Sequence, residues 1–353
     1  MNQPSALHVV LLGGSGFVGQ AILRRLQHLH AAGRPVRVTA LVHRQALPFQ
    51  ADWLQPVLGP LGHEQAPLPA GLFPQAPHVL IHGASKQTDP DGSGYAVNER
   101  GVQQLCRQMG ASTRGVLFLS SMSVHGDGPH RGVLEEAPIR PGTALAASRA
   151  RCEALWAQWA QHTGRRAWMV RPRFVVGPGD RFLRPGLKRL SRAPVRLGSG
   201  QQRLSIIGVD DLASAIVHLA ESMLSQPHPP QGEFEAWLAA YQQPISLDTL
   251  TTLAARSQPA SSVLPALDAR RWTLPTWAPL WQAVGRLPHA SIRQLAQRIL
   301  LLGQDQWANT SKLARQLPEP LLAQDPEQAV REAFQTPPCA PSSAHSSSQP
   351  VTP

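Results

Sequence analysis

The chain is poor in cysteine and has no long hydrophobic run. Its three cysteines, Cys106, Cys152 and Cys339, are too scattered to form a metal knuckle, so we expect a reducing cytoplasm and no metal site. No apolar run reaches the ~18 residues that a membrane span needs. The first residues show neither the basic lead nor the cleavage site of a signal peptide. The sequence therefore predicts a cytoplasmic protein without a membrane span.

Acidic residues are scarce relative to basic ones, with 22 Asp and Glu against 33 Lys and Arg and a net charge of +11. Such an excess is typical of proteins with anionic partners. No basic motif interleaved with aromatic residues accompanies it, so we expect neither nucleic acid nor membrane as a partner. A phosphate-bearing small molecule fits the charge, and so does an arginine-rich solvated surface. Nothing fixes the oligomeric state, and a homodimer stays open.

The first half of the chain alternates short apolar runs with helical patterns. The runs cover residues 9–12, 36–42, 57–58, 79–82, 116–120 and 168–170. Most do not alternate with polar residues, as is typical of strands buried on both faces. Strands and helices in alternation predict an α/β fold with a doubly wound parallel sheet of the Rossmann type.

The pattern changes after about residue 178, where loops rich in proline and arginine separate short helices. We predict a dinucleotide-binding domain over residues 1–177, to which residues 204–224 return. A smaller C-terminal substrate lobe is then formed by residues 178–203 and 225–334. The proline- and serine-rich stretch 335–353 lacks periodicity and is predicted to be disordered.

Three glycines lie between the first apolar run and the first helical pattern. Gly13, Gly16 and Gly19 are spaced G-x-x-G-x-x-G. In a strand–turn–helix context Gly13 permits the tight turn, Gly16 lets a pyrophosphate approach the backbone, and Gly19 lets the helix pack closely. The pyrophosphate would lie at the helix N-terminus, where free N–H groups and the helix dipole favour negative charge.

The end of the second strand discriminates between nicotinamide cofactors. NAD-binding proteins usually place an acidic residue there, against the ribose hydroxyls. This strand ends in "ALVHRQ", in which Arg44 could meet a 2′-phosphate. The residues therefore favour NADP(H) over NAD(H), which stays possible, while Arg44 as a solvated loop residue is the alternative interpretation.

Several segments in order resemble the extended short-chain dehydrogenase/reductase superfamily, of the NAD-dependent epimerase/dehydratase type. They are "HVLIHGAS" (78–85), "YAVNERGVQQLC" (95–106), "LFLSSMSVHG" (117–126), "VRPRFVVGPGD" (170–180), "LSIIGVDDLASAIV" (204–217) and "NTSKLARQL" (309–317). The resemblance implies NAD(P) binding and a small-molecule substrate. The residues that it and the glycine turn assign to the cofactor are Gly13, Ser15, Gly16, Phe17, Val18, Gly19, Arg44, Gly83, Ala84, Asn98, Arg149 and Pro172.

The chain departs from the family at its usual catalytic pair. Members of this family work through Tyr-x-x-x-Lys with a Ser or Thr, in which the tyrosine exchanges a proton with the substrate oxygen. In this chain Leu145 falls on the tyrosine position and Arg149 on the lysine position. The only tyrosines, Tyr95 and Tyr241, lie elsewhere. Leucine cannot exchange a proton, whereas an always-charged Arg149 could still hold a ribose or a phosphate.

Two residues remain as candidates for the chemistry. Ser121 matches the catalytic Ser/Thr and could bind the substrate oxygen, or it could simply satisfy the backbone at a strand end. His125 takes the tyrosine position of the V-Y-G segment and could supply the missing proton, because histidine titrates near neutral pH. We therefore list Ser121, His125 and Arg149 as the candidate catalytic residues.

Two functions of different classes follow. The first is an NAD(P)-dependent oxidoreductase or epimerase/dehydratase with a non-standard proton relay, acting on a small carbonyl or hydroxyl compound or on a sugar nucleotide. The sugar nucleotide is the weaker choice, because the arginine expected against its diphosphate falls on Leu204, with Arg203 one residue away. The second is a non-catalytic NAD(P)-binding protein, such as a redox sensor or an assembly factor.

Overall fold

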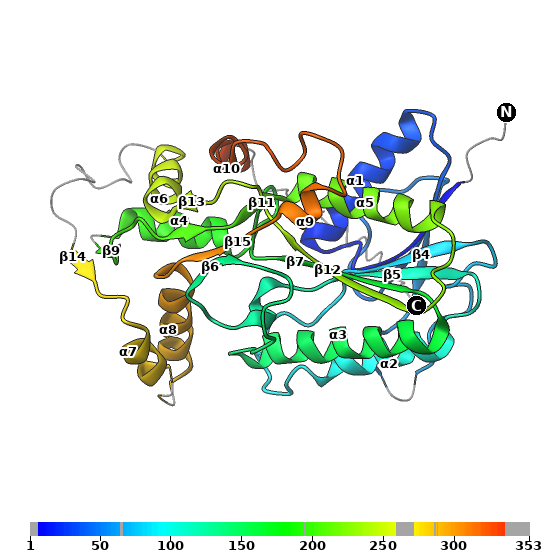
Figure 1. Cartoon of the computed structure of the whole chain (residues 1–353), viewed down its shortest axis with the longest axis horizontal. Helices are drawn as coiled ribbons and strands as arrows, with labels where there is room; N and C mark the ends of the chain where they lie inside the picture. The colour runs from blue at the N-terminus through cyan, green and yellow to red at the C-terminus, as the bar shows by residue number, and fades with distance from the viewer. Residues whose placement is uncertain are drawn as a thin grey trace, which may run out of the picture.

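Figure 1 shows the computed structural model of the chain. It describes residues 6–63, 66–193, 195–258, 272–285, 287 and 289–335. The stretch 335–353, predicted to be disordered, lies outside these residues except for Gln335, which ends the last helix.

Seven parallel strands form the central sheet, in the order β12-β7-β5-β4-β1-β2-β3. They are β1 (Leu7–Leu12), β2 (Val36–Val42), β3 (Leu54–Leu58), β4 (His78–His82), β5 (Thr113–Leu119), β7 (Arg166–Pro172) and β12 (Glu233–Ala239). The strand order reverses between β1 and β4, which is where open α/β sheets bind ligands. The predicted Rossmann-type α/β class is confirmed.

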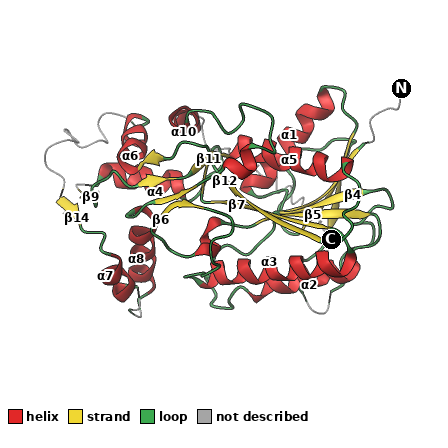
Figure 2. Cartoon of the chain, in the orientation of Figure 1, coloured by secondary structure: helices red, strands yellow, loops and turns green. Residues whose placement is uncertain are grey.

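Helices cover both faces of this sheet, as Figure 2 shows. Helices α1 (Phe17–Ala31) and α5 (Val209–Ser225) pack on one face, and α2 (Ala96–Gln108) and α3 (Ala144–Thr163) pack on the other. Side chains alternate across a strand, so Val9 and Leu11 enter the core under α1 while Val10 and Leu12 enter the core under α3. A strand buried on both faces is mostly apolar, which is why the apolar run 9–12 predicts β1.

A smaller lobe lies beside the carboxyl ends of the strands, on the left of Figure 1. It contains a four-stranded sheet in the order β13-β10-β15-β6 and two further pairs, β11-β8 and β14-β9. Its elements are β6 (His130–Val133), β8 (Phe174–Val176), α4 (Leu183–Arg192), β9 (Val195–Leu197), β10 (Arg203–Leu204), β11 (Ile206–Gly208), β13 (Ile245–Ser246), α6 (Leu247–Arg256), β14 (Trp272–Leu274), α7 (Ala278–Val284), α8 (Ala290–Leu302), β15 (Gln306–Ala308), α9 (Ser311–Ala314) and α10 (Pro326–Gln335).

Two segments lie in a different part of the fold from the one predicted. Strand β12, which falls within the predicted substrate lobe, pairs along its whole length with β7 and forms the edge of the central sheet. Strand β6, which falls within the predicted dinucleotide-binding domain, pairs with β15 in the sheet of the lobe. Both placements depend on pairing with distant parts of the chain, so the local pattern of the sequence does not reveal them.

Candidate functional site

A cleft of about 1420 Å³ runs along the carboxyl ends of β1, β2, β4, β5 and β7 and is bordered by α4 and α8. Its volume exceeds the roughly 300–1,000 Å³ of a typical site for one small ligand, so a dinucleotide and a second small molecule fit together. Every residue predicted to bind the cofactor lines it, as does Ser121: Gly13, Ser15, Gly16, Phe17, Val18, Gly19, Arg44, Gly83, Ala84, Asn98, Arg149 and Pro172.

The turn between β1 and α1 requires glycine at two positions. Gly13 has a φ of +86°, and a Cβ on it would lie 2.8 Å from the backbone nitrogen of Ala84. A Cβ on Gly19 would lie 2.0 Å from the carbonyl oxygen of Gly13. Both contacts are with backbone atoms, so a side chain at Gly13 would push the turn away from the loop after β4, and one at Gly19 would push the helix away from the turn. The start of α1 is therefore held close to the turn and to the loop after β4.

The N-terminus of α1 opens into the cleft without a side chain that covers it. Gly16 is its N-cap, no side chain caps it, and its first turn carries no acidic residue. The first N–H groups of a helix have no partner within the helix, and the helix dipole adds positive potential there. The residues present therefore fit a phosphate group at this end of the cleft.

The segment after β2 contributes basic and neutral side chains to the cleft. His43, Arg44 and Gln45 all line it and are exposed. The carboxylates that line it, among the residues the structure describes, are those of Asp91, Asp127 and Asp180. None of these three residues follows β2. Among the described residues, the segment after β2 therefore places no carboxylate in the cleft, and this absence is the charge pattern from which the sequence predicts a 2′-phosphate contact.

Asn98 holds the loop after β4 in place. Its Oδ1 accepts a hydrogen bond from the Lys86 backbone N–H at 2.7 Å, and its Nδ2 donates to the Lys86 carbonyl at 3.3 Å. The Lys86 ammonium is itself paired with Asp89 at 2.5 Å and Asp91 at 2.9 Å. Asn98 therefore shapes this wall of the cleft through the backbone, and the charge of Lys86 is already compensated.

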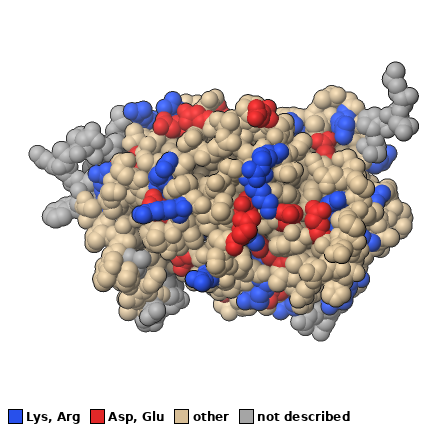
Figure 3. Space-filling model, viewed as in Figure 1, with Lys and Arg blue, Asp and Glu red and all other residues tan. Residues whose placement is uncertain are grey.

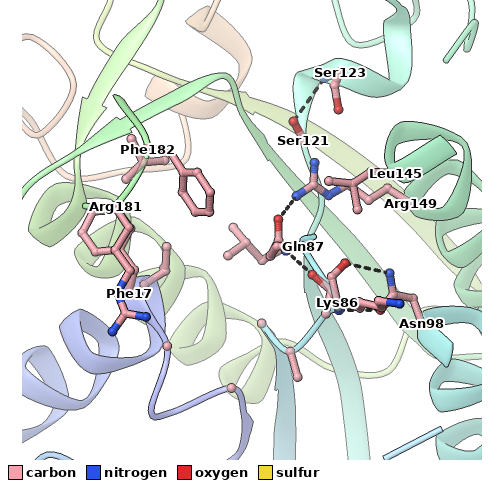
Figure 4. Close-up of a pocket in the computed structure, with 18 of the residues that line it drawn as sticks. Phe17, Lys86, Gln87, Asn98, Ser121, Ser123, Leu145, Arg149, Arg181 and Phe182 are labelled. Carbon is pink, nitrogen blue, oxygen red and sulfur yellow. Dashed lines mark hydrogen bonds between the residues drawn. The ribbon is translucent and has the colours of Figure 1, made fainter. Parts of the chain in front are cut away.

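The two substituted catalytic positions both lie in the cleft. Leu145 and Arg149 project from the first turns of α3, which begins after Thr143, whose hydroxyl accepts the Ala146 N–H at 3.2 Å. Arg149 Nη2 donates to Gln87 Oε1 at 2.6 Å. In Figure 4 the Arg149 guanidinium points toward Gln87 and Ser121. Burial lowers the pKa of Arg149 to about 10, which leaves it charged at neutral pH.

Ser121 caps the short 3₁₀ helix η1 (Met122–His125) that follows β5. Its hydroxyl oxygen accepts the Ser123 N–H at 3.2 Å, as Figure 4 shows. The proton of this hydroxyl is left to donate into the cleft. Beside it, the Ser123 hydroxyl is buried without a hydrogen-bond partner. Ser121 therefore satisfies the backbone at this strand end, and its role toward a substrate oxygen stays a prediction.

His125 is not brought to the cleft, which argues against its predicted role as proton donor. Its Nδ1 lies 3.0 Å from the Ala137 carbonyl oxygen, which requires a proton on Nδ1. Its Nε2 lies 3.2 Å from Arg171 Nη1 and so accepts from that guanidinium. Burial, with Arg171 adding to the effect, lowers the pKa of His125. His125 therefore links the Ala137 carbonyl to the Arg171 guanidinium, and it is not among the residues that line the cleft.

His82 at the end of β4 makes the stability of the fold depend on pH. Its side chain is 2% exposed, with ring centroids 5.2 Å from Phe118 and 5.8 Å from Trp156. Burial lowers its pKa to about 4 from the usual 6.5, so the unfolded chain takes up the proton first. Stability from this group is therefore complete above pH 6.5 and is lost as the pH falls toward 4.

We expect His82→Gln to remove part of this pH dependence. At pH 5.5 the wild type should lose about 1 kcal/mol of unfolding free energy through His82 alone, a loss that the variant does not share. Urea denaturation at pH 7.5 and 5.5 measures the difference. His28→Gln, at an exposed position on α1, is the matched control. Equal pH slopes for wild type and His82→Gln would show that His82 is not the source.

The surface, the helices and the metal-ligating side chains add one observation each. On the face drawn in Figure 3, lysine and arginine side chains are interspersed with aspartate and glutamate. Within the described part of the chain, no helix combines the length and apolarity needed to cross a membrane. A search of the same residues finds no group of three or more His, Cys, Asp or Glu side chains placed to hold a metal ion.

Comparison with known proteins places the chain in a family. The model of the NAD dependent epimerase/dehydratase family matches residues 9–231. A curated relative, 3beta-hydroxysteroid-dehydrogenase/decarboxylase isoform 2 of Arabidopsis thaliana, is 29% identical over 168 residues. That match covers 43% of this chain and 28% of the relative, so the chain spans under a third of the relative's length.

Two solved structures share the fold over nearly the whole chain. UDP-N-acetylglucosamine 4-epimerase of Methanobrevibacter ruminantium, in complex with UDP-N-acetylmuramic acid, has a TM-score of 0.61 and 16% identity, covering 93% of this chain and 97% of that one. The dTDP-glucose 4,6-dehydratase of Bacillus anthracis, in complex with NAD, has a TM-score of 0.62 and 12% identity, covering 93% and 96%. Because the family model matches more than half of its length, this chain belongs to the NAD-dependent epimerase/dehydratase family.

Proposed function

We propose that the chain binds NADP(H) in the cleft and catalyses hydride transfer between the nicotinamide and a small carbonyl or hydroxyl substrate. One observation carries the proposal: every residue assigned to the cofactor from sequence lines the same cleft, although these residues come from separate strands, helices and loops. The bare N-terminus of α1 fits the pyrophosphate, and Arg44 fits a 2′-phosphate. The family's structural neighbours include a dehydratase solved with NAD.

The substrate oxygen is stabilised by charge and hydrogen bonding rather than by a tyrosine. A nicotinamide held in the cleft by the α1 N-terminus and Arg44 would supply or receive the hydride. Ser121 donates a hydrogen bond to the oxygen, and the charge of Arg149 stabilises the negative charge that develops there during reduction. Leu145 has no proton to give, so water completes the proton transfer. Arg149 is held in position by its hydrogen bond to Gln87.

A sugar nucleotide is a weaker substrate class for this cleft. Arg203, the arginine nearest to the position expected against a diphosphate, lies exposed on β10 with its guanidinium 5.1 Å from the centre of the Trp307 ring. It is not among the residues that line the cleft. The proposal therefore names a small carbonyl or hydroxyl compound.

Arg44→Glu tests the choice of cofactor. We expect the Kd for NADPH to rise about 10- to 100-fold, because a charge-assisted hydrogen bond to the 2′-phosphate is lost and a like charge replaces it. The Kd for NADH should change little. Titration by reduced-nicotinamide fluorescence measures both. Arg37→Glu carries the same charge change at an exposed position of β2 outside the cleft and is the control. An unchanged Kd for NADPH in Arg44→Glu would contradict the assignment.

A second candidate function is favoured by the side chain at position 145. Leu145 lines the cleft and has no proton to exchange. A dinucleotide-binding protein without catalysis, such as a redox sensor, would tolerate leucine at this position. Incubation of the protein with NADPH and a broad panel of aldehydes and ketones separates the two functions. Consumption of NADPH with any of these compounds supports the enzyme. Tight NADPH binding without consumption across the panel supports the sensor.

A further inference from the structure

Two arginines in the cleft carry positive charge that the fold does not pair. Arg149 and Arg173 both line the cleft and are both half-buried. Among the described residues, no ion pair joins either guanidinium to a carboxylate, and the Nε of Arg173 is buried without a hydrogen-bond partner. Burial lowers the pKa of Arg173 to about 10, and repulsion by Arg149 acts in the same direction. Both side chains therefore bring their positive charge into the same cleft.

Two other buried arginines of the fold are each paired with a carboxylate. Arg171 forms a two-point ion pair with Glu153, and Arg166 pairs with Glu233 at 3.2 Å. The Asp127 carboxylate attracts the Arg173 charge, but no ion pair joins the two side chains in the described part of the chain. The Asp127 carboxylate packs beside Gly142, where a Cβ would lie 2.1 Å from its Oδ2. Arg149 and Arg173 thus differ from Arg166 and Arg171 in lacking such a carboxylate partner among the described residues.

The two guanidinium groups lie next to the proposed reaction centre. Arg173 directly follows β7, and Ser121 lies two residues beyond the end of β5, the strand that pairs with β7. The Ser120 N–H donates to the Val170 carbonyl at 2.9 Å, which holds the two strand ends together. Arg149 faces Ser121 from α3 (Figure 4). A group bound between the arginines would therefore belong to the molecule whose oxygen Ser121 holds.

We propose that Arg149 and Arg173 together bind a carboxylate or phosphate group of the substrate, so that the substrate is a small oxyanion. The proposal rests on the proposed function and names its substrate class. Guanidinium groups present parallel N–H donors that match the geometry of both anions. The α1 N-terminus lies at the other end of the cleft floor and is occupied by the cofactor in this scheme. The substrate anion therefore needs its own site.

Removal of one charge should separate binding from folding. When an arginine supports the fold, its replacement lowers the stability of the protein. Replacement of an uncompensated arginine that serves to bind a ligand does not lower it. We expect Arg173→Gln to leave the melting temperature of the ligand-free protein unchanged or higher. A clear fall in that temperature would identify Arg173 as a structural residue and would overturn the proposal.

Anion binding is measured on the protein saturated with NADP⁺, so that the cofactor occupies the phosphate positions at α1 and Arg44. Inorganic phosphate and malonate are titrated separately by calorimetry, and the stronger probe shows which anion the site prefers. We expect Arg173→Gln and Arg149→Gln to weaken the preferred probe at least about tenfold, with Arg173→Lys less affected. Arg203→Gln, outside the cleft, is the control.

Each outcome decides one of the two proposals. If NADP⁺ does not bind, the proposed function fails, and the same titrations on the cofactor-free protein still test the arginine pair. If neither probe binds to the wild type, or if Arg173→Gln binds both as tightly as the wild type, the anion site is wrong. If the anion site is wrong but NADP⁺ still binds, the proposed function stands without the anion site.

Discussion

The double variant Leu145→Tyr/Arg149→Lys is expected to consume NADPH about 100-fold or more faster than the wild type on the same panel of carbonyl compounds. A positioned general acid typically contributes 10²- to 10⁴-fold, and the tyrosine hydroxyl supplies the proton that Leu145 cannot. Lysine in place of Arg149 lowers the pKa of that tyrosine by its nearby charge. Initial rates at saturating NADPH measure the gain.

The matched control keeps the size of the ring and removes its proton. Leu145→Phe/Arg149→Lys places the same bulk in the cleft, so it should show no gain. Both variants should still bind NADPH, because the glycine turn and Arg44 are untouched. An equal rate in the tyrosine and phenylalanine variants, with cofactor binding intact, would show that position 145 does not face the reacting oxygen.

Most of the central sheet could be predicted from the sequence because its strands are buried on both faces. Residues 9–12 of β1 and 79–81 of β4 are apolar because they are buried between two helical layers, so their composition reveals them, although His82 at the end of β4 is a buried polar exception. Strand β12 is different, because it begins Glu233-Phe-Glu and its first residues are partly exposed at the sheet edge. Its place depends on pairing with β7, which no local pattern encodes.

The half of the cleft at the glycine turn was also predictable, because backbone geometry restricts its residue types. Only glycine fits where the Gly13 carbonyl approaches α1, so Gly13 and Gly19 mark the turn. The substrate half was not predictable in the same way. His125 occupies the expected place in its motif, yet η1 turns its ring toward the Ala137 carbonyl. A position in a motif does not determine the direction of a side chain.

Arg173 and Gln87 were missed for a related reason. An arginine is informative only when the charges around it are known, and those that act on Arg173 are Arg149 on α3 and Asp127 in the loop after η1. Gln87 becomes relevant only through its contact with Arg149, which lies 62 positions further along the chain. The "RPR" segment at 171–173 did not show that Arg171 is paired while Arg173 is not.

Glu153→Gln is expected to destabilise the fold by about 3–5 kcal/mol, the largest effect on stability that we predict. The Glu153 carboxylate accepts hydrogen bonds from Arg171 Nη2 at 2.6 Å and from Arg171 Nε at 2.9 Å, and both side chains are at most 5% exposed. The amide of glutamine leaves the Arg171 charge buried and uncompensated. Urea denaturation followed by tryptophan fluorescence measures the change, and Trp156 on α3 is fully buried beside this network.

The matched control is Glu327→Gln, which breaks the exposed pair with Arg331 on α10 and should cost about 0.5 kcal/mol or less. A second variant separates the charge from the packing. Glu153→Leu/Arg171→Met removes both charges, so it should regain much of the stability lost in Glu153→Gln. If the double variant were as unstable as the single one, packing rather than the uncompensated charge would be the cause. Arg171 precedes Arg173 by two residues, so the ion pair of Arg171 with Glu153 also fixes the end of β7 from which Arg173 enters the cleft. Among the described residues, one arginine at this strand end is paired and the other is not. The proposed anion site depends on that contrast.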